Sequence, residues 1–570
     1  VYVAAGLGLL AVARARRGPR LGAAAAAAAL AGLFFFAAPA WDAAAMTIGV
    51  FRISLMEDAL DEESWGDPDI KYYYDGVTTT VSIELWGRHF ALKNNGKVDA
   101  SNGDDMPTQI MIAAYPLLLH PEGPEDLNVA IIGFGSGVTV GAALQFPVDH
   151  VDAVELENAV VAASSVFGST EGEPADPEFD VNHLVYRRPF EPVTRAPNPE
   201  YDWSDPNSFV IEERLTIHNE DGRNYLASTD EKYDVIVSEP SNPWITGVSN
   251  MFTVESFASS AEALAPGGVF AQWVQLYELS PTNIKTIFRT FASVYPHVVL
   301  FAAEDLSSDT VLLGSFEPIE LDLARVARAM EDERVRAELE RAYILEPTDV
   351  LARVLLVDRE ELLAYTDGPD PDVARFGGAA YEGTPLNTDD NAVIEFAAPR
   401  DLISFRRFAG YLATIYTSEW PYARLAERLT GIGTGEEGAA ALARQAVSLL
   451  ANGRKREAER CLERARELDG DHPEVAAAAQ IARLLAGAGS PPPMRAKRPS
   501  RSARMTDDEE EELRERVADV DRSLEARAYG DALERFGRIP DHLWRRGGPQ
   551  MLMLKGYLHF ANADPDDSTR

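Results

Sequence analysis

The segment Asn128-Val-Ala-Ile-Ile-Gly-Phe-Gly-Ser-Gly137 decides the fold class of this chain. Its apolar half is typical of a buried parallel strand, and its glycines form a tight turn before a helical stretch, Val138 to Gln145. Glycines in such a turn let the backbone approach a ligand closely. Similar turns also occur for structural reasons alone, so the glycine pattern by itself is a weak signal.

The next predicted strand, His150 to Glu155, narrows the choice of ligand. It ends in an acid 18 positions after Gly137, close to the spacing at which a carboxylate meets ribose hydroxyls. Glu155 is therefore the predicted ribose ligand. Val138 stands where a dinucleotide fingerprint has its third glycine, which disfavours a pyrophosphate cofactor and favours an adenosyl sulfonium.

Several further stretches accompany this core and make the pattern specific. They are Tyr73-Tyr-Asp-Gly76, Asn95-Gly-Lys-Val-Asp99, Asp221-Gly-Arg-Asn-Tyr-Leu226, Tyr233-Asp-Val-Ile-Val-Ser-Glu-Pro-Ser-Asn-Pro-Trp244 and Asn387-Thr-Asp-Asp-Asn391. Together with the glycine turn they resemble the spermidine synthase family, the polyamine aminopropyltransferases. That family shares the fold of class I S-adenosylmethionine-dependent methyltransferases. The resemblance runs from about residue 72 to 315 and is strongest to the bacterial membrane-fused branch.

The resemblance implies an enzyme that transfers the aminopropyl group of decarboxylated S-adenosylmethionine, its co-substrate, to a polyamine or another amine. Asp221 would accept a hydrogen bond from the adenine amine, a geometrically selective contact, and Glu239 would orient and deprotonate the acceptor. The implied nucleoside ligands are Gly133, Gly135, Gly137, Glu155, Asp221 and Gly222, and the implied acceptor ligands are Gln109, Asn242 and Tyr277. For Tyr277, packing at the strand end is an equally good interpretation.

The acceptor pocket departs from the family pattern. Glu239 stands where active spermidine synthases have aspartate, and Asn242 replaces a second aspartate. Asp99 occupies the place of a glutamine, and only Gln109 remains of a Tyr-His or Tyr-Gln pair. A different acceptor or a loss of catalysis would explain these changes. Two rival functions stay open: a methyltransferase using intact S-adenosylmethionine, and a non-catalytic, membrane-attached nucleoside-binding scaffold.

Composition excludes several classes of partner and site. The formal charge of -38 over 570 residues argues against nucleic acid and suits a cationic substrate or simple solubility. The single cysteine, Cys461, excludes an internal disulfide framework. The nine histidines lack the spacing of a metal site, so no metal is predicted.

An uncharged run of 21 residues, Leu21 to Trp41, is long enough to cross a bilayer as a helix. A signal peptide is the competing interpretation, because arginines precede the run and Ala37-Ala-Pro-Ala40 ends it. We expect a membrane span, with further spans upstream of Val1, and hence attachment to the bacterial inner membrane. The side of the soluble domain stays open.

The predicted architecture is an α/β chain whose Rossmann-like domain follows a small β-sheet and precedes α-helical repeats. We expect an inserted surface loop from Ser169 to Glu212, rich in Pro, Asp, Glu and Asn. From Ala439 to Ala478 the spacing of small and large residues resembles a tetratricopeptide (TPR) repeat, with a weaker copy near Tyr529. The repeats either pack on the enzyme domain, which we expect, or bind a protein partner, and a homodimer is compatible with the family. The predicted segments are 1–41 transmembrane, 56–110 small β domain, 111–316 Rossmann-like, 317–400 helical extension, 401–487 helical and TPR-like, 488–511 linker, and 512–570 helical and TPR-like.

Overall fold

The computed structural model describes residues 46–47, 69–173, 180–189, 198, 200–304, 307–367, 384–403 and 424–487, with isolated positions 516, 535 and 538. The chain divides into two units, Val1–Gly487 and Ala488–Arg570, and nearly all described residues belong to the first. Within the described ranges, no helix is long and apolar enough to cross a membrane. The predicted span Leu21–Trp41, the predicted linker 488–511 and the second repeat near Tyr529 lie outside them.

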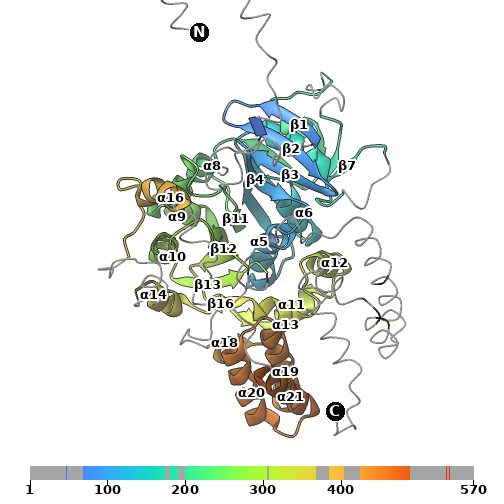
Figure 1. Ribbon diagram of the computed structural model, residues 1–570, viewed down its shortest axis with the longest axis vertical. Coiled ribbons are helices and arrows are strands. Elements are labelled where there is room, and N and C mark those ends of the chain that lie inside the picture. Colours follow the sequence, from blue (N-terminus) through green and yellow to red (C-terminus); the bar gives the residue numbers. More distant parts are fainter. Residues whose placement is uncertain are drawn as a thin grey trace, which may run out of the picture. The chain divides into compact units, whose positions relative to one another are not determined.

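A four-stranded antiparallel sheet opens the described fold (Figure 1). Strands β3 and β4 are joined by Asn95 and Gly96, both at positive φ (50° and 81°), the two-residue turn that suits the twist of a hairpin. The small β-sheet predicted ahead of the Rossmann-like domain is thus confirmed. The four strands are β1 (Asp69–Asp75), β2 (Thr80–Trp86), β3 (His89–Asn94) and β4 (Lys97–Ser101).

The central sheet has eight strands in the order β10-β6-β5-β11-β12-β14-β13-β16. The first five are parallel, whereas β14 runs antiparallel between β12 and β13. This order confirms the predicted Rossmann-like, methyltransferase-type α/β fold. The bounds are β5 (Asn128–Ile132), β6 (His150–Glu155), β10 (Leu215–Asn219), β11 (Tyr233–Ser238), β12 (Leu264–Gln275), β13 (His297–Ala302), β14 (Asp309–Ser315) and β16 (Val354–Leu356).

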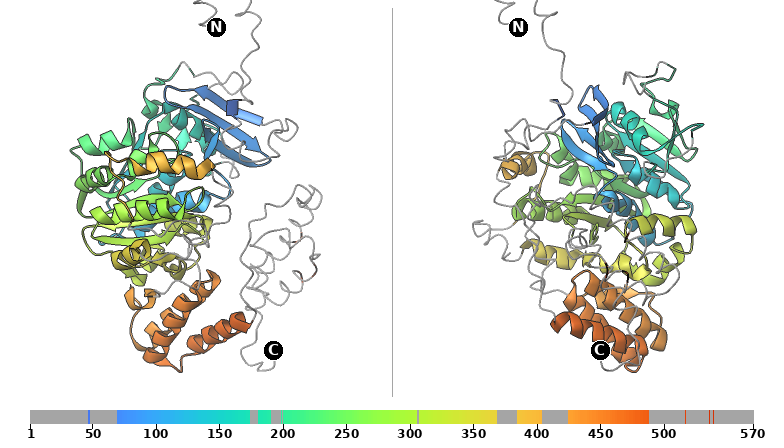
Figure 2. Two further views of the ribbon diagram at one scale, coloured as in Figure 1. Left: turned by 60° about the vertical axis from the view of Figure 1, so that its left-hand side comes forward. Right: turned by 45° about the vertical axis from the view of Figure 1, so that its right-hand side comes forward.

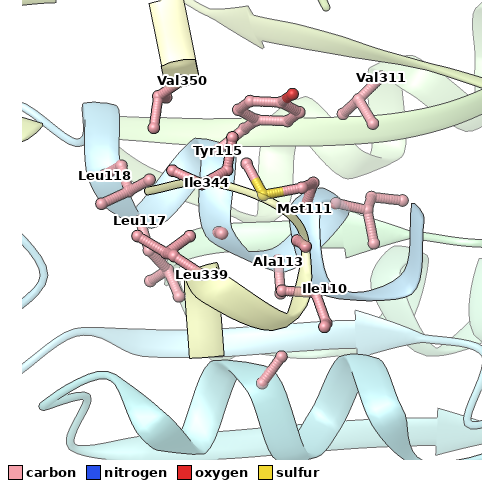
Figure 3. Close-up of a cluster of buried hydrophobic side chains, with 14 of the residues drawn as sticks. Ile110, Met111, Ala113, Tyr115, Leu117, Leu118, Val311, Leu339, Ile344 and Val350 are labelled. Carbon is pink, nitrogen blue, oxygen red and sulfur yellow. The ribbon is translucent and has the colours of Figure 1, made fainter. Parts of the chain in front are cut away.

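Helices cover both faces of this sheet, and each face has its own apolar cluster. Helix α5 is buried almost all round, as expected for a helix with apolar residues on every side. Figure 3 shows its Tyr115, Leu117 and Leu118 packed near Leu339, Ile344 and Val350 from the segment after the sheet. The flanking helices are α5 (Met106–Leu119), α6 (Val138–Gln145), α7 (Asn158–Ser164), α8 (Gly222–Ser228), α9 (Val254–Ala263) and α10 (Pro281–Val294), with short 3-10 turns at Ser165–Phe167, Pro206–Ser208 and Val248–Phe252.

The predicted helical extension, 317–400, is not wholly helical. Its short strand β16 pairs with β13, so the central sheet continues beyond residue 316, where the Rossmann-like domain was expected to end. A second short strand, β15 (Leu321–Asp322), pairs with β17 (Leu429–Thr430). The helices here are α11 (Leu323–Ala329), α12 (Glu333–Arg341), α13 (Pro347–Ala352), α14 (Arg359–Asp367) and α16 (Val393–Ile403).

The region with TPR-like spacing forms consecutive helices, with Gly453 at φ 72° in the turn between the first two long ones. Its first long helix packs on α13: Gln445 Nε2 donates to the Thr348 carbonyl at 3.0 Å, and Ser448 donates to Asp349 at 2.8 Å. In both views of Figure 2 these orange helices lie away from the blue small sheet. The helices are α18 (Leu425–Arg428), α19 (Gly435–Ala451), α20 (Lys455–Asp469) and α21 (Pro473–Gly487).

The insertion after α7 is more than the surface loop that we expected. It forms a small sheet from β7 (Ser169–Thr170), β8 (Val185–Tyr186) and β9 (Val210–Ile211). Within it Asn182 is fully buried, and its amide donates to the Ser136 carbonyl of the glycine turn at 2.8 Å. The described part of the insertion therefore stabilises the glycine turn through this buried hydrogen bond.

This support predicts a strict requirement for glycine at position 141. A Cβ there would lie 1.7 Å from the Asn182 carbonyl oxygen, so Gly141→Ala should lower the free energy of unfolding by about 1–3 kcal/mol. Denaturant unfolding of the full chain measures this. Gly470→Ala, where the nearest atom is 3.3 Å away, is the matched control; equal stability of the two variants would contradict the packing described.

Candidate functional site

A cavity of about 1820 Å³ lies between the small sheet and the carboxyl ends of the central parallel strands. Ligands of open α/β sheets bind at this edge. The small sheet forms one wall, and the loops after β5, β6, β10 and β11 form the other. The predicted residues that line it are Gln109, Gly133, Gly135, Glu155, Asp221, Gly222, Glu239 and Tyr277, whereas Gly137 and Asn242 are not among the lining residues.

The glycine turn brings the end of β5 close to the end of β11. Gly133 has φ 96°, and a Cβ there would lie 2.8 Å from the Glu239 carbonyl oxygen. The Glu239 backbone N–H donates to the Ile132 carbonyl at 3.0 Å, which continues the parallel pairing one residue beyond β11. Gly137, at φ 79°, begins α6 instead of facing the cavity.

Glu155, the predicted ribose ligand, is the last residue of β6. Its two carboxylate oxygens accept from the backbone N–H groups of Phe134 and Glu157, each at 3.0 Å. Burial raises the pKa of this carboxyl. These bonds fix the carboxylate against the glycine turn, and each oxygen keeps a second lone pair for a ligand.

Asp221 and Gly222 begin α8 at the same edge. The Asp221 side chain caps the helix by accepting from the Asn224 N–H at 2.9 Å, which leaves its other oxygen available at the cavity wall. A Cβ on Gly222 would lie 2.3 Å from Ile132 Cγ2, so only glycine allows this close approach of α8 to β5.

Glu239, the predicted catalytic acid, is held by a neighbour in α6. Its Oε2 accepts from the Thr139 hydroxyl at 2.6 Å. Burial raises the pKa of Glu239 to about 7, with a further upward contribution from Asp105 and Asp309, while the Thr139 bond and Lys97 oppose the shift. A carboxyl with a pKa near neutrality can both accept and release a proton.

Gln109 lines the cavity, but both atoms of its amide are engaged with protein groups. Nε2 donates to the Ser101 carbonyl at 2.9 Å, and Oε1 accepts from the Ser136 hydroxyl at 2.5 Å. These bonds tie α5 to the small sheet and to the glycine turn. Asn242 is fully buried, and its amide has no hydrogen-bond partner within the described residues.

Sequence reasoning missed Asp309, a further cavity acid. Asp309 begins β14, and its Oδ1 accepts from the Trp273 indole N–H at 2.9 Å. Burial raises its pKa to about 6. No local motif marks this position, because only the antiparallel pairing of β14 with β12 brings its first residue to the ligand-binding edge.

Lys97 and Asp105 are two further neighbours of Glu239, and the sequence predicted no role for either. Lys97 pairs with Asp99 at 2.5 Å, and Ser241, in the loop that carries Glu239, donates to Asp99 at 2.6 Å. Burial raises the pKa of Asp105, which accepts a hydrogen bond from the Ser101 hydroxyl.

Across the described ranges, no group of three or more His, Cys, Asp or Glu side chains is arranged to hold a metal.

A comparison with known protein families finds a match in the part of the chain that includes Asp221 and Glu239. Residues 205–304, from the strand before Asp221 to the end of β13, match the protein-family model described as "Spermine/spermidine synthase domain". This part of the chain is therefore similar to a spermine/spermidine synthase domain.

The curated relatives that match this chain are named polyamine aminopropyltransferases. A polyamine aminopropyltransferase of Bacillus mycoides (strain KBAB4) is 24% identical over 39% of this chain and 66% of its own length. Polyamine aminopropyltransferase 2 of Aquifex aeolicus is 22% identical over 49% of each chain. The chain thus spans just under two thirds, or about half, of the curated relatives it matches. The crystal structure of spermidine synthase from Thermotoga maritima aligns with 59% of this chain and 88% of its own at 16% identity, with a TM-score of 0.32.

The raised pKa of Glu239, a partly buried acid, predicts a pH-dependent stability. Glu239 titrates near 4.5 when exposed and near 7 in the fold, so between these values the folded state binds more protons than the unfolded state. Its contribution to stability is therefore lost as pH rises from about 4.5 to 7. Glu239→Gln should match the wild type at pH 4 and exceed its unfolding free energy by about 1–3 kcal/mol at pH 8, allowing for partial solvent screening.

Thermal unfolding of the full chain across this pH range measures the difference. Glu317→Gln, at an exposed glutamate outside the cavity, is the charge-matched control. A stability difference between Glu239→Gln and wild type that does not change with pH would show that Glu239 is not buried as described.

Proposed function

We propose that this protein transfers the aminopropyl group of decarboxylated S-adenosylmethionine to a polyamine or a related amine. The observation that carries the proposal is the position of Glu239: a partly buried carboxyl at the end of β11, on the same edge of the sheet and in the same cavity as the nucleoside-type residues Glu155 and Asp221. The printed names of the curated relatives, polyamine aminopropyltransferases, support the same reaction.

The charge of the cavity favours cationic ligands. Its only described lysine and arginine, Lys97 and Arg223, are ion-paired with Asp99 and Asp389. A donor without a carboxylate group therefore fits better than intact S-adenosylmethionine, which disfavours a methyltransferase. The described carboxylates that line the cavity are Asp99, Asp104, Asp105, Glu155, Glu157, Asp221, Glu239 and Asp309.

Glu239 would act on the acceptor. Aliphatic amines are almost fully protonated near neutral pH, and only the neutral form attacks carbon. Glu239 takes one proton from the ammonium group, and the amine nitrogen then bonds to the methylene beside the sulfonium. The carbon–sulfur bond breaks with its electron pair going to sulfur, which leaves neutral methylthioadenosine. The new secondary amine keeps the positive charge, and Glu239 afterwards returns its proton to solvent.

Glu155 and Asp221 would hold the donor nucleoside. Glu155 offers free lone pairs toward ribose hydroxyls, and Asp221 offers its uncapped oxygen to the exocyclic amine of adenine. Glu155 ends β6 and Asp221 follows β10, on one side of the glycine turn, and Glu239 follows β11 on the other, so a sulfonium bound next to the turn would lie near Glu239. Positioning of two reactants in this way supplies a large part of the rate of such displacements.

The N-terminal segment completes the proposal. We propose attachment to the bacterial inner membrane through Leu21–Trp41, on the strength of its length and lack of charge. The TPR-like helices α18 to α21 belong to the first unit, where α19 packs on α13. We propose that they serve as a scaffold within that unit.

Removal of the Glu239 carboxylate tests the reaction. With decarboxylated S-adenosylmethionine and a panel of amines, Glu239→Ala should lower kcat by at least about 100-fold, because no other group accepts the proton as directly. Mass spectrometry of the product and methylthioadenosine release measure turnover. Calorimetry with methylthioadenosine should give the same affinity for variant and wild type.

Wild-type binding preferences decide between the proposal and its rivals. Tighter binding of decarboxylated than of intact S-adenosylmethionine supports aminopropyl transfer. Preference for the intact donor would favour a methyltransferase, and unchanged turnover in Glu239→Ala would remove this residue from the mechanism. Binding without turnover of any amine would leave a nucleoside-binding scaffold.

Asp221→Asn tests adenine recognition separately from folding. Asparagine also caps helices well, so α8 should keep its N-terminus while the charged acceptor is lost. We expect methylthioadenosine to bind about 10-fold more weakly, the cost of one charge-assisted hydrogen bond. Calorimetry measures the affinity, and circular dichroism checks the fold. Unaltered affinity would show that Asp221 only caps α8.

A further inference from the structure

Three strand ends converge at one corner of the cavity. Strand β11 ends at Ser238, which pairs with Gln272 of the parallel strand β12. Strand β14 runs antiparallel to β12, and its first residue, Asp309, pairs with Gln275. The carboxyl ends of β11 and β12 and the amino end of β14 therefore lie at the same edge.

Glu239 and Asp309 also point to the same side of the sheet. Side chains two positions apart on a strand share a face. Val237 and Val311 belong to one apolar cluster, and Glu239 and Asp309 are each two positions from one of these valines. Trp273 lies in that cluster too and lines the cavity between the two acids.

Asp309 has one oxygen committed and one free. Its Oδ1 accepts from the Trp273 indole at 2.9 Å, which fixes the orientation of the carboxylate. Its Oδ2 has no hydrogen-bond partner among the described residues, although Asp309 lines the cavity. The free oxygen is therefore available to a ligand.

The side-chain amide of Gln275 is a second, independent observation that points to a ligand at this corner. Gln275 is the last residue of β12 and lies directly opposite Asp309 in the ladder. It is two positions from the cavity-lining Trp273 on the same strand face, although it is not itself a lining residue. Its side chain is 0% exposed, and neither atom of its amide has a partner within the described residues. An unpaired buried amide is costly, and a bound polar group would satisfy it.

Because position 242 holds an asparagine, the acceptor pocket lacks one of the two acids that the resemblance predicts. Asn242 stands where the resemblance to spermidine synthases predicts a second acid, and it is buried away from the cavity wall. The loop after β11 thus supplies one carboxylate, Glu239, to an acceptor pocket that would otherwise have two.

We propose that Asp309, with the Gln275 amide beside it, binds the second cationic group of the acceptor amine. This inference rests on the proposed function and deepens it. Glu239 deprotonates the amine group that attacks, and Asp309 holds the far group as an ammonium ion. The charge missing at Asn242 is supplied from β14, on a different element at the same edge. Asp309 is thereby a determinant of selectivity for diamines over monoamines.

The test compares two acceptors of equal chain length, 1,4-diaminobutane and butylamine, with decarboxylated S-adenosylmethionine as donor and the full chain as enzyme. Asp309→Asn should raise KM for the diamine by about 10- to 100-fold with a smaller change in kcat. Its effect on kcat/KM for butylamine should be several-fold smaller than its effect on kcat/KM for the diamine. Asp309→Glu should recover part of the preference, and Asp230→Asn, an exposed acid outside the cavity, should keep all of it.

The outcomes separate the inference from the proposed function. A wild type that transfers to no amine refutes the function itself. An active wild type whose diamine preference survives Asp309→Asn within twofold refutes only the role of Asp309. Methylthioadenosine affinity reports on folding of each variant. If Asp309→Asn does not fold, Gln275→Met decides: a fall of several-fold in diamine preference supports the subsite, and no fall overturns it.

Discussion

The candidate site depends on the close approach of two strand ends, β5 and β11. The parallel pairing continues to Glu239, whose N–H donates to the Ile132 carbonyl, and the absence of a Cβ at Gly133 makes room for the Glu239 carbonyl. Any side chain at position 133 would separate the glycine turn from the loop that carries the acid. The nucleoside half and the acceptor half of the cavity are therefore positioned by one backbone contact.

The same contact brings carboxylates together in a buried place, which is unfavourable unless a cation or proton is present. Burial and repulsion from neighbouring carboxylates raise the pKa of Glu239 to about 7 and that of Asp309 to about 6. Thr139, Trp273 and Lys97 offset part of this cost through hydrogen bonds and charge. A cationic ligand would offset more of it, so the cavity is built to favour positive charge.

The sequence predicted the parts of the site that lie on single local motifs. The glycine turn, Glu155, Asp221 and Glu239 each follow a strand that could be recognised from its apolar run, and the structure brings them to one cavity. Features set by long-range pairing were missed. Asp309 reaches the edge only because β14 is antiparallel, and β16 joins the sheet from a segment that was expected to be helical. Gln109 was predicted to bind the acceptor, but in the buried helix α5 its amide is hydrogen-bonded to Ser101 and Ser136. Asn182, in the insertion, was also missed, because its hydrogen bond to the Ser136 carbonyl joins segments far apart in the sequence.

Relocation of a charge is easier at this edge than elsewhere in the fold. The loop after β11 packs tightly, with Asn242 fully buried, so an acid there would be ionised only at a high desolvation cost. The first residue of β14 faces the cavity and already has an indole N–H donor in Trp273, which stabilises the ionised form. A carboxylate at position 309 can thus replace one at position 242 without any change in backbone pairing. Because the antiparallel strand begins where the parallel strands end, the fold offers both positions to the same ligand.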